Sequence, residues 1–119
     1  MAIQRLETNA RMSHIVLHAG TVYLAGAVAQ NFDQGIEAQT REALAEVEAA
    51  LSRVGSSKKN ILTTQIWLRD IERDFDAMNS VWEAWLPAGA APARATCQAR
   101  MAAPDILVEL IVTAALSEP

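Results

Sequence analysis

The stretch "ILVELIVTAAL" (residues 106–116) decides what kind of sheet this chain can build, because its apolar side chains occupy both parities of a β-strand. The segment "ILTTQIWL" (61–68) has the same property. Strands of this kind normally have both faces covered by other parts of the protein. We therefore expect both segments to be strands that are buried on their two sides.

Outward from these two segments, strand and helix patterns alternate along the chain. Period-2 runs between turn residues predict strands, and apolar residues at three-and-four spacing predict helices. The expected elements are strands at 14–20 and 21–29, a helix at 36–54, a strand at 61–70, a helix at 71–86, and strands at 93–101 and 106–116. The order β-β-α-β-α-β-β predicts one α/β (α+β) domain over residues 1–119, with a mixed sheet and two helices on one face.

The second face of that sheet has no cover in this pattern. Two helices can cover only one face, and a chain of 119 residues is too short for a further core. A second copy of the chain is therefore expected on the other face. This predicts an obligate homo-oligomer in which the sheets face one another.

Composition and charge disfavour several classes of protein. The net charge of −4 and the pI near 5.1 argue against nucleic-acid binding. No apolar run reaches the roughly 20 residues of a membrane span, and the N-terminal residues do not resemble a secretory signal. The single cysteine, Cys97, fits a reducing compartment, so we expect a cytoplasmic protein. His14 and His18 have no further ligand at metal spacing, so we expect no metal site.

An arginine stands at the start of an expected strand in "APARATCQA" (91–99), although a lone buried arginine is costly. If the last two strands form a hairpin that turns near residues 101–102, partner numbers sum to about 203, and Glu109 lies opposite Arg94. Two interpretations of the pair stay open. It is a structural ion pair, or it is a site where Arg94 clamps a small carboxylic acid and Glu109 holds or deprotonates a water.

The helix expected at 71–86 has an apolar stripe that we expect to be buried, formed by Phe75, Met78, Trp82, Trp85 and Leu86. Asn79 falls inside this stripe, where an apolar residue would be expected. Its amide either caps a loop, which is the commoner case, or contacts a ligand.

Two small residues in the strands raise similar alternatives. Gly26 interrupts the strand expected at 21–29, which indicates either a bulge or the close approach of a ligand. Cys97 has apolar neighbours and lies at the opposite parity from Arg94. We therefore expect its thiol to be buried and inert.

Several segments together resemble one known family. They include "SHIVLHAGTVYLAG" (13–26), "FDAMNSVWEAW" (75–85), "APARATCQA" and "VEL" (108–110). The specific part is "PAR" with a glutamate fifteen residues after the arginine, a spacing that Arg94 and Glu109 have. On these motifs, which run through nearly the whole chain, the sequence resembles the reactive-intermediate (imine) deaminase family of Rid or YjgF-like proteins.

This resemblance implies a chorismate-mutase-like fold assembled as a homotrimer, with active sites in clefts between subunits and no cofactor. It implies that Arg94 binds the carboxylate of a 2-imino acid and that Glu109 helps to position the attacking water. It also places Ala25, Gly26 and Asn79 along the cleft. The implied activity is hydrolysis of 2-imino acids to 2-oxo acids and ammonia.

Three positions of the implied cleft depart from well-studied imine deaminases. Met12 stands where they have a tyrosine, Ala25 where they have a serine, and Thr96 where they have a cysteine. We interpret the changes at Met12, Ala25 and Thr96 as the loss of polar handles from the pocket, so a non-catalytic module that binds small carboxylic acids in a regulatory role is the alternative. Ribonuclease activity, reported for some relatives, is disfavoured by the acidic pI.

Overall fold

The computed structural model describes residues 1–117 and contains six strands, two long helices and one short 3₁₀ helix. Their bounds are β1 Gln4–Thr8, β2 Ser13–His18, β3 Thr21–Leu24, α1 Ile36–Arg53, η1 Lys58–Asn60, β4 Ile61–Leu68, α2 Ile71–Trp85, β5 Ala93–Gln98 and β6 Val108–Ala115. No helix within these residues is long and apolar enough to cross a membrane.

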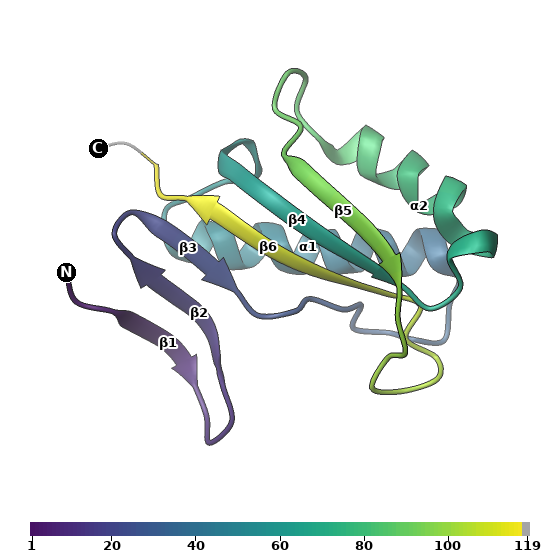
Figure 1. Cartoon of the computed structure of the whole chain (residues 1–119), viewed down its shortest axis with the longest axis horizontal. Coiled ribbons are helices and arrows are strands. Elements are labelled where there is room, and N and C mark those ends of the chain that lie inside the picture. The colour runs from purple at the N-terminus through teal and green to yellow at the C-terminus, as the bar shows by residue number, and fades with distance from the viewer. Residues whose placement is uncertain (118–119) are drawn as a thin grey trace.

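All six strands form one mixed sheet in the order β1-β2-β3-β6-β4-β5. Neighbouring strands are antiparallel except β4 and β5, which are parallel. The two helices pack against each other on one side of the sheet (Figure 1). The expected α+β class, with a mixed sheet and two helices on one face, is confirmed.

The expected hairpin between the last two strands is wrong. β5 pairs only with β4, and β6 lies between β3 and β4 (Figure 1). The reason is that helix α2 separates β4 from β5, and a crossover helix between two neighbouring strands makes them parallel. β6 is apolar at both parities and takes a central position, which leaves the shorter β5 at the edge.

The bounds of the first strands also differ from the expectation. β1 is absent from the expected elements because its sequence, "QRLET", is almost entirely exposed and has a single apolar residue to mark a face. β3 ends at Leu24 instead of continuing to residue 29, and beyond it only Ala27 forms a bridge, to Leu110 of β6. Gly26 thus lies where the chain leaves the regular ladder.

Burial alternates strictly along β6 and separates the two faces of the sheet. Val108, Leu110, Val112 and Ala114 are buried beneath the helices. The residues between them, Glu109 included, lie on the other side and are half-buried in the single chain. We call these two sides the helix face and the open face.

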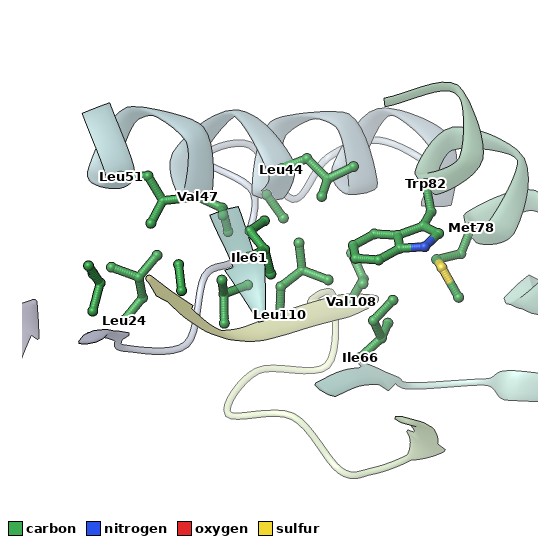
Figure 2. Close-up of a cluster of buried hydrophobic side chains, with 14 of the residues drawn as sticks. Leu24, Leu44, Val47, Leu51, Ile61, Ile66, Met78, Trp82, Val108 and Leu110 are labelled. Carbon is green, nitrogen blue, oxygen red and sulfur yellow. The ribbon is translucent and has the colours of Figure 1, made fainter. Parts of the chain in front are cut away.

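The core fills the space between the helix face and the two helices (Figure 2). Leu44, Val47 and Leu51 of α1 pack over β6 and β4, and Met78 and Trp82 of α2 pack beside them. The expected stripe of α2 is correct for these two residues and wrong for Phe75, which is 37% exposed. Phe75 faces Arg94 of the edge strand instead of an apolar layer.

Candidate functional site

Arg94 lies on the helix face of the edge strand β5. Its partner in the parallel ladder with β4 is Thr64, which is fully buried, and paired residues point to the same side of a sheet. The side chain of Arg94 is half-buried, and its Nη1 donates a hydrogen bond of 2.7 Å to Oδ1 of Asn79. Its Cζ lies 5.9 Å from the ring centroid of Phe75 and 5.8 Å from that of Trp82.

Helix α2 supplies all three of these neighbours from one face. Phe75, Asn79 and Trp82 follow four-and-three spacing, which places them in line along a helix. Phe75 and Trp82 are seven positions apart, which is about 10 Å of helix rise, so a guanidinium about 6 Å from each ring lies midway, level with Asn79. We call these three residues the α2 cradle. Asn79 therefore holds Arg94 and does not cap a loop.

The cradle orients the guanidinium without neutralising its charge. The ion pairs within residues 1–117 are Arg41–Glu37, Arg53–Glu7 and Arg73–Asp74, and none involves Arg94. A guanidinium has five N–H donors, and in this part of the chain one of them has a hydrogen-bond partner, which is a neutral amide. Aromatic ring faces attract a cation but accept no strong hydrogen bond from it. The remaining donors suit an external anion.

Glu109 lies on the opposite side of the sheet from Arg94. Its partner on β4 is Trp67, whereas the partner of Arg94 is Thr64. These two β4 residues are three apart, and an odd separation along a strand reverses the face. The predicted cross-strand pair of Arg94 and Glu109 is therefore wrong, because each strand pairs with β4 and not with the other.

The carboxyl group of Glu109 is partly buried and lies close to the backbone of Gly26. A Cβ atom on Gly26 would overlap Oε2 of Glu109, so only a glycine leaves room for the carboxyl group where it stands. Burial raises the pKa of Glu109 above the ordinary carboxyl value. Within residues 1–117 its carboxyl group makes no side-chain hydrogen bond or ion pair. Gly26 therefore lies where β3 loses its regular pairing, and its lack of a side chain also allows the close approach of Glu109.

The remaining candidates divide between these two sides. Thr96 lies on the helix face opposite Ile66, and its hydroxyl is buried without a partner in residues 1–117. Ala25 precedes Gly26 and donates its N–H to the carbonyl of His14. Met12 is exposed and lies in the turn between β1 and β2.

Cys97 is exposed, so the expectation of a buried thiol is wrong. It pairs with Trp67 and therefore lies on the open face, which neither helix of residues 1–117 covers.

Two separate groups emerge from these positions. The Arg94 group consists of Arg94, Thr96 and the α2 cradle on the helix face. The Glu109 group consists of Glu109, Gly26 and Ala25. A hollow of about 280 Å³ lies beside the second group and is lined by Ala25, Gly26 and residues of α1, and neither Arg94 nor Glu109 lines it.

The aromatic residues of the α2 cradle were assigned to the core from the sequence, not to a site. A signal for them exists in the pattern, since Phe75 and Trp82 flank Asn79 at helical spacing. That signal becomes specific only when an arginine is known to face the same side of the helix.

Comparisons with known proteins agree over nearly the whole chain. Residues 2–116 match the family described as Endoribonuclease L-PSP. The RutC family protein YoaB of Escherichia coli K12 is 42% identical over 116 residues, which cover 98% of this chain and 100% of the relative. A relative from Acinetobacter baylyi named 3-aminoacrylate deaminase RutC is 37% identical over 73 residues, or 61% of this chain and 56% of the relative.

A solved structure shows the same architecture. The crystal structure of a YjgF family member from Neisseria meningitidis has a TM-score of 0.95 and 38% sequence identity to this chain, and covers 100% of this chain and 98% of its own. The match in sequence and that in structure therefore identify one family. This chain belongs to the Endoribonuclease L-PSP family, whose members also carry the names RutC, YjgF and Rid.

Proposed function

We propose that this protein hydrolyses reactive 2-imino acids, or their enamine tautomers, to 2-oxo acids and ammonia. The observation that carries the proposal is the state of Arg94, which is half-buried, oriented by a neutral amide and two rings, and unpaired with any carboxylate of residues 1–117. A buried cation is costly without an anionic partner. A small carboxylic acid is the partner that a guanidinium fork binds in two-point geometry.

The proposed site needs two copies of the chain. Arg94 and Glu109 point to opposite sides of one sheet, so in this proposal Arg94 of one subunit meets Glu109 of its neighbour. The open face supports such an assembly, since Tyr23 is 47% exposed there and Ile111 and Trp67 are only half-buried in a single chain. A homotrimer with sites between subunits is the arrangement that the family resemblance implies.

The chemistry requires little beyond orientation. The substrate carboxylate binds Arg94, and a water held by Glu109 adds its oxygen to the carbon of the C=N bond while the nitrogen gains a proton. The resulting carbinolamine expels ammonia and leaves the 2-oxo acid. Glu109 relays the proton from the water to the leaving nitrogen. Imines already hydrolyse in water, so fixing the two reactants is the main contribution of the protein.

The name of one curated relative states a deaminase reaction. The Acinetobacter baylyi relative is named as a deaminase of 3-aminoacrylate, which is an enamine of a small carboxylic acid. That name describes the relative. Because the amino group of 3-aminoacrylate is on C3, the name supports hydrolysis of an enamine of a small carboxylic acid, but not the position of the nitrogen in the substrate of this chain.

The direct test is to generate imino acids with an amino-acid oxidase and to measure how fast ammonia and oxo acid appear. We expect Arg94→Ala to lower the protein-dependent rate by roughly 10²-fold or more, because it removes the guanidinium that holds the substrate carboxylate in this proposal. Arg41→Ala, which removes a surface ion pair, is the control and should leave the rate unchanged.

A second variant tests the same charge if Arg94→Ala does not fold. Asn79→Asp keeps the size of the side chain and the hydrogen bond to Arg94, but places a carboxylate against the guanidinium. The folded protein should then bind anions more weakly and turn over more slowly. Parent-like rates in both variants would end the proposal.

Binding without turnover is the second candidate. It is favoured by the absence, within residues 1–117, of any group that hydrogen-bonds Glu109 and would orient it as a base. No acceleration of imine hydrolysis, together with saturable binding of 2-oxo acids that requires Arg94, would select this candidate.

A further inference from the structure

Phe75 is the accessible apolar surface beside Arg94. Its ring centroid lies 5.9 Å from Cζ of Arg94, nearly the same distance as that of Trp82. The two rings differ in exposure, since Phe75 is 37% exposed and Trp82 is 5% exposed. A ligand on Arg94 can therefore touch the ring of Phe75, whereas Trp82 is closed off by the core.

The distances set the size of group that reaches this ring. A carboxylate bound through two N–H···O bonds of about 2.8 Å has its carbon roughly 4 Å from Cζ, in the plane of the guanidinium. The ring lies to one side of that position. A branched substituent of four carbons therefore reaches further toward the ring and covers more of it than a single methyl group.

We infer that Phe75 makes the site selective for acids with a larger apolar substituent. This inference rests on the proposed function, because it takes the carboxylate of the ligand to be held by Arg94. Apolar contact of this kind discriminates between substrates by about 10- to 200-fold per methylene-sized difference in a closed pocket, and by less at an exposed wall. No charged side chain of the α2 cradle would favour an acidic or basic substituent instead.

The test compares the binding of two 2-oxo acids to the assembled protein by calorimetry. 2-Oxopropanoate carries a methyl group, and 4-methyl-2-oxopentanoate carries a branched group of four carbons. We expect Phe75→Ala to weaken binding of the larger acid about fivefold to tenfold more than that of the smaller one. Phe75→Leu, which keeps apolar surface without a ring, should retain most of the preference.

Two further variants make the result specific. Phe75→Gln keeps side-chain length, removes apolar character and replaces Phe75→Ala if that variant fails to fold. Val81→Ala trims the same helix at a position that faces Leu44 and Trp85 instead of Arg94, and should leave both affinities unchanged.

Equal weakening of both acids in Phe75→Ala would show that the ring only orients Arg94, and would overturn the inference. An unchanged preference would overturn it as well. Arg94→Ala separates this failure from failure of the proposed function. If Arg94→Ala abolishes binding while Phe75→Ala leaves the preference intact, only the inference about Phe75 falls. If Arg94→Ala binds both acids normally, the proposed function falls too.

Discussion

The Arg94 group and the Glu109 group differ in how completely one chain builds them. Arg94 is held by an amide and two rings from a single helix, all within the protomer. The carboxyl group of Glu109 occupies space that is free because Gly26 has no side chain. No group in residues 1–117 orients this carboxyl group. The folded single chain therefore orients Arg94 on the helix face. On the open face, the orientation of Glu109 depends on the groups that pack against it from outside.

The largest test of this comparison mixes two inactive variants. Arg94→Ala and Glu109→Gln should each be nearly inactive alone. If each site takes Arg94 from one subunit and Glu109 from another, random exchange of subunits restores about a quarter of the sites, since half of the arginine donors and half of the glutamate donors are intact. Activity should therefore rise from near zero to about a quarter of the parent value.

The control for this experiment is the double variant with both changes, mixed with either single variant. No site there combines the two native residues, so activity should stay near zero. Absence of recovery in the main mixture, with subunit exchange verified by mass, would show that the two residues do not come from different subunits.

A smaller effect is expected from a methyl group added beside Glu109. Gly26→Ala forces Oε2 of Glu109 out of its place, because the new Cβ would overlap it. We expect the turnover rate to fall about tenfold while the affinity for 2-oxo acids stays within a factor of two or three, since Arg94 is untouched.

Gly35→Ala is the matched control for this change. A Cβ atom there meets nothing within 4 Å, and its backbone φ of −80° suits any residue. Its rate and affinity should equal those of the parent. A rate of Gly26→Ala equal to that of Gly35→Ala would show that the position of Glu109 does not matter for turnover.

The smallest expected effect concerns stability and its dependence on pH. Burial raises the pKa of Glu109, so the fold favours the protonated carboxyl and disfavours the ionised one. Glu109→Gln should therefore stabilise the protein at neutral pH by roughly 0.5 kcal/mol, a modest value because solvent still reaches the group. The gain should vanish as the pH falls below the ordinary carboxyl range, where the native side chain is also neutral.

Urea unfolding at neutral and acidic pH measures this difference. Glu83→Gln, which changes an exposed glutamate of α2, is the control and should leave the free energy of unfolding close to that of the parent. A stabilisation by Glu109→Gln that persists unchanged at low pH would mean that its cause is packing and not the cost of burying a carboxylate.

Much of the fold was predictable because it depends on local patterns. The helix expected at 36–54 is α1, Ile36–Arg53, and the boundary expected between the strands at 14–20 and 21–29 is a turn in which Ala19 and Gly20 have positive φ. The unusual positions of Arg94, Asn79 and Gly26 were also visible, since Arg94 is a cation at the start of an expected strand and the other two interrupt apolar patterns. Each of these signals comes from residues within a few positions of one another.

The tertiary structure alone decided which strands pair and which face each residue takes. A hairpin of the last two strands and a crossover between β4 and β5 satisfy the same alternation of side chains, so periodicity cannot choose between them. The pairing with β4 moved Glu109 to the open face, left Cys97 exposed and joined Arg94 to the α2 cradle. Residue type and spacing were enough to show that Arg94, Asn79 and Gly26 are unusual for their expected elements. Their partners were determined by contacts between distant segments, because strand pairing and helix packing depend on the whole chain and not on neighbouring residues.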